Sequence, residues 1–163
     1  MRQLRPRDNR LLYRLEAREA VHLKQLLAHF PFTPPPPSEV TKTDSRAEVQ
    51  EREELLAESL REHRRQLKRL AHALTGPEHL MELKSCWRLA LSPAEREFLL
   101  QILNDIRVGC WEGLGRPEPL PCLKGGLEPR EYALISLMHI AGAFEHHLLE
   151  AAEPDGGIPA LGE

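Results

Sequence analysis

The chain has 163 residues and a formal net charge of −3, with 41% hydrophobic and 29% charged residues. These proportions are ordinary for one globular domain and exclude a wholly disordered chain. Because acids and bases nearly balance, the composition also argues against a protein that coats nucleic acid by bulk electrostatics.

The sequence predicts a cytoplasmic protein. No apolar run approaches the ~20 residues needed to cross a bilayer, so we expect no membrane partner. The first ten residues, MRQLRPRDNR, contain no apolar core of a signal peptide. The three cysteines, Cys86, Cys110 and Cys122, are odd in number and widely spaced, which favours a reducing compartment over a disulfide framework.

The spacing of apolar residues predicts four main helices, over residues 16–30, 47–74, 93–114 and 129–152. The clearest start is at Ser92, where Pro93 and Glu95 complete a capping box with proline at the first helical position. Gly76-Pro77 and Gly115 end two of these helices. Residues 10–15 and 85–90 could be extended or helical, and the sequence does not decide between the two.

We therefore predict an all-α fold, a bundle of four main helices in a single domain over residues 1–152. The last helix is apolar over more than half of its circumference, which places it near the centre of the bundle. Residues 31–46 are expected to form a Pro-rich, polar linker after the first helix, and residues 153–163 a flexible tail.

The helix over 47–74 has a narrow apolar seam and a segregated charge. Residues 47–58 carry five Glu and one Arg (−4), whereas residues 61–69 carry four Arg and one Lys against one Glu (+4). This split could simply match the helix dipole, pair antiparallel with a partner or a second copy, or bind nucleic acid. The seam consists of Leu56, Leu60, Leu67, Leu70 and Leu74, and the basic face of Arg61, Arg64, Arg65, Lys68 and Arg69.

The helix over 93–114 carries a candidate partner-binding patch. Trp and Arg are typical of interaction hot spots, and Arg107 is spaced to stack on Trp111. Burial of the same stripe beneath the helix over 47–74 is the alternative. Asp105 lies at the edge of the apolar face of this helix, near Gly109, and is predicted to be a structural polar residue. The patch comprises Leu100, Asn104, Arg107 and Trp111.

Two pairs are weak candidates for metal ligands. Glu19 and His22 form a Glu-x-x-His half-motif of di-metal helical bundles, and His146 and Glu150 lie one turn apart. Helix capping by Glu19 and a solvated helix edge at His146 are the ordinary alternatives. We find no placed catalytic nucleophile and no cofactor motif, so we predict no cofactor.

The order of these elements, and above all the pentapeptide Leu103-Asn104-Asp105-Ile106-Arg107, resembles a bacterial family of uncharacterised all-helical proteins, best known in actinobacteria. Genes of that family often lie beside the gene for the Clp protease adaptor that reads N-degrons. The resemblance implies a helical fold and a neighbourhood in Clp-type proteolysis. The family has no established activity.

The leading hypothesis is a non-enzymatic helical module that binds a protein, with Clp protease components expected as partners by resemblance only, or that forms a homodimer. One alternative is a metal-dependent helical-bundle enzyme that uses His and carboxylate ligands. Another is a nucleic-acid binder that uses the basic stretch 61–69, although the overall charge argues against nucleic acid as the partner.

Overall fold

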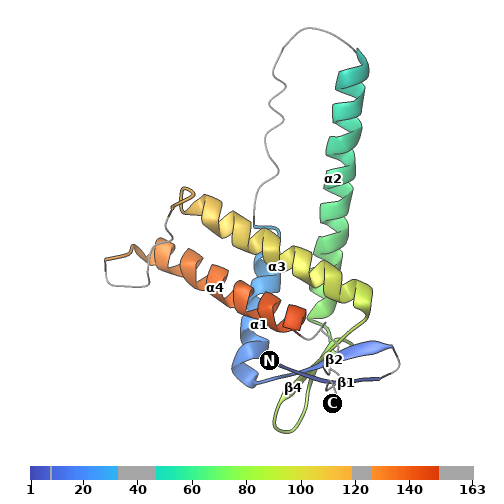
Figure 1. Ribbon diagram of the computed structural model, residues 1–163, viewed down its shortest axis with the longest axis vertical. Helices are drawn as coiled ribbons and strands as arrows, with labels where there is room; N and C mark the ends of the chain where they lie inside the picture. Colours follow the sequence, from blue (N-terminus) through green and yellow to red (C-terminus); the bar gives the residue numbers. More distant parts are fainter. Residues whose placement is uncertain (8, 33–46, 119–125, 151–163) are drawn as a thin grey trace, which may run out of the picture.

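The computed structural model describes residues 1–7, 9–32, 47–118 and 126–150, without the side chains of 5–7 and 47–53 (Figure 1). Within these residues the fold combines four helices with a four-stranded antiparallel sheet, so the all-α prediction is wrong. The predicted linker falls largely, and the predicted tail entirely, outside the described residues. In chain order the elements are β1 (Arg2–Arg7), β2 (Arg10–Leu15), α1 (Ala17–His29), α2 (Ala47–Leu74), β3 (Leu80–Glu82), β4 (Trp87–Leu91), α3 (Pro93–Gly113) and α4 (Pro129–Glu150).

The sheet has the strand order β1-β2-β4-β3, with every neighbouring pair antiparallel. Asn9, between β1 and β2, lies in a turn and has φ of 60°, a left-handed conformation that asparagine tolerates well. The β2–β4 pairing then joins segments far apart in the sequence, with Tyr13 opposite Leu89. The sequence left open whether residues 10–15 and 85–90 are extended or helical. Residues 10–15 form β2, and residues 87–90 belong to β4.

The two-residue period of a strand explains why β2 forms. Tyr13 and Leu15 are fully buried, and the intervening Arg14 is exposed. Alternation of this kind places one face of a sheet on the core and the other in solvent. The arginines in β1 and β2 hid the pattern because they interrupt the apolar run, although Arg2, Arg10 and Arg14 are all exposed.

The structure contains the four predicted helices. At the start of α3, the Glu95 N–H donates to Ser92 Oγ at 3.2 Å, and the Ser92 N–H donates to Glu95 Oε2 at 2.7 Å. These two bonds are the reciprocal capping box expected from the sequence. Burial raises the pKa of Glu95, but the hydrogen bonds from Ser92 and His79 outweigh it and hold this pKa below its ordinary value.

The helix α3 holds the centre of the molecule, where we expected the last helix to lie. It runs antiparallel to α4 along most of its length and also contacts α1, α2 and β4 (Figure 1). The sheet closes one end of the helical layer. The α4 helix keeps exposed residues on its outer side, among them Tyr132 and Leu149, so it belongs to the periphery. Its long apolar arc is used against α3 and α1.

Candidate functional site

The N-terminal half of α2 projects beyond the other described helices and strands (Figure 1). Its leucine seam is therefore divided. Leu67 and Leu74 are buried against the body, whereas Leu56 and Leu60 are 58% and 63% exposed. A neighbouring leucine, Leu55, is 61% exposed. We call the exposed leucines Leu55, Leu56 and Leu60 the α2 tip patch.

Polar contacts mark where α2 meets the body. His63 Nε2 lies 3.2 Å from Gln101 Oε1 on α3, and Arg64 Nη2 lies 3.8 Å from Asp105 Oδ1. The ion-pair partner of Asp105 on α3 is thus a residue of α2. Its Oδ2 is buried without a hydrogen-bond partner among the described residues.

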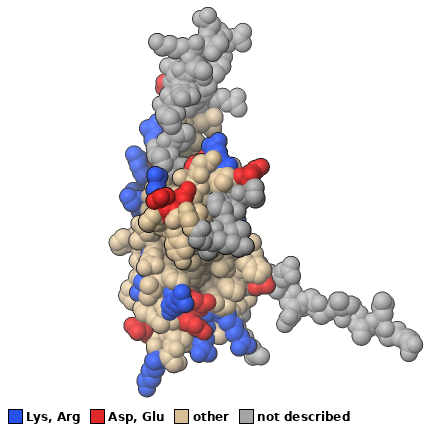
Figure 2. Space-filling model, turned by 90° about the vertical axis from the view of Figure 1, so that its left-hand side faces the viewer, with Lys and Arg blue, Asp and Glu red and all other residues tan. Residues whose placement is uncertain are grey.

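The rest of the predicted basic face points to solvent. Arg61 Nε donates to the Ala57 carbonyl at 3.2 Å, and Arg65 Nη1 lies 3.3 Å from Glu62 Oε2. Lys68 and Arg69 are exposed. Together with Arg65 and His72 they line a hollow of about 440 Å³. Figure 2 shows Lys and Arg side chains gathered along one edge of the molecule at the height of α2.

The predicted patch on α3 is largely engaged within the fold. Arg107 forms an ion pair with the buried carboxylate of Glu145 on α4, so it does not stack on Trp111 as expected. Arg116 lies over the Trp111 ring instead, 5.8 Å from its centroid. Trp111 is half-buried against the core, and its Nε1 donates to the Pro117 carbonyl at 3.4 Å.

The other two residues of that patch differ from each other. Leu100 is half-buried against the core, and Asn104 is exposed. Only Asn104 of the four predicted residues therefore remains fully available to a partner. The α2 tip patch, of which Leu56 and Leu60 belong to the predicted seam, offers the larger exposed apolar surface.

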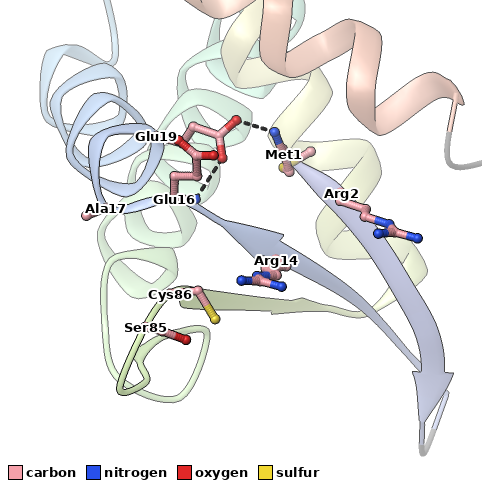
Figure 3. A pocket seen from close by; sticks show the side chains of 8 residues that line it. All are labelled: Met1, Arg2, Arg14, Glu16, Ala17, Glu19, Ser85 and Cys86. Carbon is pink, nitrogen blue, oxygen red and sulfur yellow. Dashed lines mark hydrogen bonds and ion pairs between the residues drawn. The ribbon is translucent and has the colours of Figure 1, made fainter.

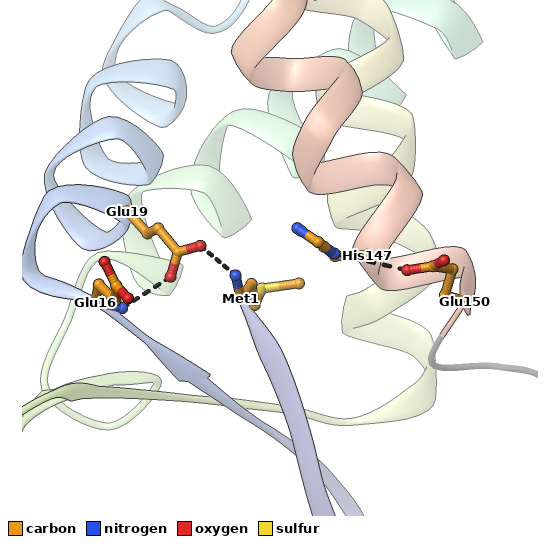
Figure 4. Close-up of polar contacts among 5 residues, drawn as sticks. All are labelled: Met1, Glu16, Glu19, His147 and Glu150. Atoms are coloured by element: carbon orange, nitrogen blue, oxygen red, sulfur yellow. Dashed lines mark hydrogen bonds and ion pairs between the residues drawn. The ribbon is translucent and has the colours of Figure 1, made fainter.

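The metal candidates do not form a cluster. His146 Nε2 lies 3.2 Å from Glu150 Oε1, and both side chains are exposed (Figure 4 shows Glu150 with the neighbouring His147). Glu19 and His22 line a small cavity of about 130 Å³ beside α4. Among the described residues no group of three or more His, Cys, Asp or Glu is arranged to hold a metal ion.

Glu19 has a capping role. The Glu16 N–H donates to Glu19 Oε2 at 2.8 Å, and the amino group of Met1 forms an ion pair with Glu19 Oε1 (Figure 4). Burial raises the pKa of Glu19, but these contacts outweigh it and lower the pKa below its ordinary value. The Glu19 carboxylate thus caps the N-terminus of α1.

A larger cavity of about 590 Å³ lies at the end of the sheet where β2 leads into α1 (Figure 3). Sequence reasoning missed it, because its walls come from three separate segments. Two arginines, Arg2 and Arg14, are directly opposite each other in the β1–β2 register. The only available signal was the high number of arginines near the N-terminus, at positions 2, 5, 7, 10 and 14. Its lining comprises Met1, Arg2, Arg14, Glu16, Ala17, Glu19, Ser85 and Cys86.

No family model matches the chain, and no curated protein or solved structure matches it either. Among the described residues, no helix combines the length and the apolar character needed to cross a membrane.

Proposed function

We propose that the protein is a non-enzymatic interaction module whose contact surface is the α2 tip patch, and that its partner there is the α2 helix of a second copy. The observation that carries this proposal is the division of one leucine seam. The same stripe that is buried at Leu67 and Leu74 continues at Leu56 and Leu60 into the projecting half, where it is exposed.

The exposed leucines favour association by the hydrophobic effect. Complete burial of a leucine side chain contributes roughly 1.5–3 kcal/mol relative to leaving it exposed. A helix pair that crosses over Leu56 and Leu60 would bury leucines from both copies. Because association itself costs several kcal/mol in lost freedom, we expect a reversible dimer that depends on protein concentration.

The charge split favours the antiparallel orientation. Residues 47–58 carry −4 and residues 61–69 carry +4, so an antiparallel pair places each acidic segment beside the basic segment of the other copy. A parallel pair would place like charges together, which is unfavourable. Such a dimer should weaken as salt screens the charges between the helices.

Sedimentation velocity over a range of concentrations tests the proposal. The natural chain should shift from monomer to dimer, and Leu60→Glu should remain monomeric with unchanged circular dichroism. Leu149→Glu is the matched control, because Leu149 on α4 is 56% exposed and lies away from the α2 tip patch. The proposal would be ruled out if the natural chain stays monomeric at all concentrations. It would also be ruled out if Leu60→Glu and Leu149→Glu lose the dimer to the same extent.

Cross-linking distinguishes the two orientations. Ser59 and Gln66 are both exposed and lie one heptad apart on the same side of α2. In an antiparallel pair that crosses near Leu56 and Leu60, Ser59→Cys lies close to its counterpart and forms an intermolecular disulfide, while Gln66→Cys does not. If both variants cross-link equally, the helices are parallel and the charge argument is wrong.

We further propose a cytoplasmic location and an accessory role in Clp-type proteolysis. The location is supported by Cys86 and Cys110, which are both free. The Clp role is supported only by the resemblance carried by Leu103–Arg107, a segment that the fold uses for packing and for its ion pairs. Mixing the purified protein with purified Clp adaptor and measuring complex formation tests that role directly.

A further inference from the structure

The outward face of the sheet carries a row of arginines. Arg2 on β1 is opposite Arg14 on β2, and Arg14 is opposite Arg88 on β4. Residues opposite each other on neighbouring antiparallel strands have Cβ atoms about 5 Å apart, so the three side chains lie within reach of one another. Because Tyr13, Leu15 and Leu89 face the core, the arginine row lies on the other face.

The described part of the chain offers this row no acidic counterpart. Like charges directly opposite each other destabilise a sheet. In the part of the chain that the structure describes, no carboxylate forms an ion pair with Arg2, Arg14 or Arg88. Arg88 Nη2 donates to the Met81 sulfur at 3.4 Å, and within the described residues Arg88 Nε is buried without a hydrogen-bond partner. Among the described residues, the positive charge of this row is therefore not compensated by an ion pair.

The row borders the cavity at the end of the sheet. Figure 3 shows Arg14 reaching toward the segment that carries Ser85 and Cys86, while Arg2 extends to the opposite side. Both arginines line the cavity. Arg2 and Arg14 are both exposed, so their side chains can reorient toward a ligand that lies between them.

Two glutamates also line the cavity, but they serve the start of α1. Glu19 accepts from the Glu16 N–H and pairs with the Met1 amino group. Glu16 is the N-cap residue, and its side chain completes the capping box with the Glu19 backbone. The guanidinium groups of Arg2 and Arg14 are thus left as the free charged donors of this cavity.

We infer that the cavity binds a small phosphorylated molecule, with its phosphate held by Arg14 and Arg2 beside Ser85. Guanidinium groups match phosphate oxygens in bidentate geometry. A phosphate monoester carries about −1.5 to −2 charge at neutral pH, which balances two guanidiniums better than a carboxylate would. The volume of about 590 Å³ lies within the range of small-ligand pockets.

Calorimetric titration with adenosine monophosphate and with pyrophosphate tests this site. Arg14→Gln should weaken binding of both probes by about tenfold or more, because a charge-assisted hydrogen-bond pair is lost. Arg10→Gln is the matched control, since Arg10 is exposed on the same strand and does not line the cavity. This control should bind the probes as the natural chain does. Arg14→Lys keeps the charge and should recover only part of the affinity.

Three outcomes would overturn the inference. The first is the absence of saturable binding of either probe at millimolar concentration. The second is an equal loss of affinity for the probes in Arg10→Gln and Arg14→Gln, which would indicate diffuse charge attraction. The third is binding of a single-stranded oligonucleotide without binding of either small probe, which would assign the arginine row to a nucleic-acid backbone. The proposed dimer and the proposed phosphate site use different residues, so the experiments can contradict one proposal without contradicting the other.

Discussion

Arg107 on α3 forms an ion pair with Glu145 on α4, and the Glu145 side chain is buried whereas the arginine is partly exposed. The pair lies between the two helices that make the most extensive contact in the molecule. Gly142 on α4 faces the Arg107 side chain, and a Cβ at that position would lie 3.6 Å from Arg107 Nε, an ordinary van der Waals contact. The ion pair fixes how α4 lies against α3.

The ion pair predicts a clear asymmetry between two substitutions. Arg107→Ala leaves the buried Glu145 carboxylate without its partner and should lower the free energy of unfolding by roughly 1–3 kcal/mol. Arg116→Ala removes an exposed i,i+4 pair with Glu112 and should cost less than about 1 kcal/mol. Urea unfolding followed by circular dichroism measures both. Equal costs would show that the α3–α4 contact does not depend on Arg107.

The divided seam of α2 predicts different costs along one stripe. Leu74 is fully buried, so Leu74→Ala should lower the free energy of unfolding by about 2–5 kcal/mol. Leu60→Ala should change the stability of the monomer by about 0.5 kcal/mol or less, because its side chain is exposed. The measurement is urea unfolding at a concentration where the protein is monomeric. A large cost at Leu60 under that condition would mean that the tip is packed within one copy.

The capping box of α3 predicts a loss of stability in acid. The folded-state pKa of Glu95 is below its ordinary value of 4.5, so its contribution is complete above that value and is lost as the pH falls toward the folded pKa. Between about pH 5 and pH 3, the unfolding free energy of Glu95→Gln should therefore fall less steeply than that of the natural chain. Glu78→Gln, at an exposed position, should follow the natural profile.

The two described cysteines should differ in reactivity. Burial raises the pKa of Cys110 to about 11, so its reactive thiolate is scarce in the folded protein. Cys86 is only half-buried and lines the cavity at the end of the sheet. With a maleimide reagent at about pH 8, peptide mapping should find Cys86 modified well before Cys110. Unfolding in denaturant should remove the difference, and comparable rates in the folded state would contradict the burial of Cys110.

Local signals in the sequence determined the helices. Ser92, Pro93 and Glu95 set the start of α3, because a capping box needs only residues within one turn. The buried residues Leu99, Ile102, Ile106 and Cys110 of the same helix lie three or four positions apart. These features depend on neighbours three or four positions away, which a sequence pattern displays directly.

The sheet and the candidate sites were decided by tertiary structure. Pairing of Tyr13 with Leu89 joins strands far apart in the chain, and the arginines within β1 and β2 disguised strands that are only six residues long. The same is true of Arg107, whose partner Glu145 lies on another helix. The leucine seam of α2 could be traced from sequence, but periodicity is identical for covered and uncovered positions. Only the packing of the body against the C-terminal half of α2 determined that Leu74 is core and Leu60 is surface.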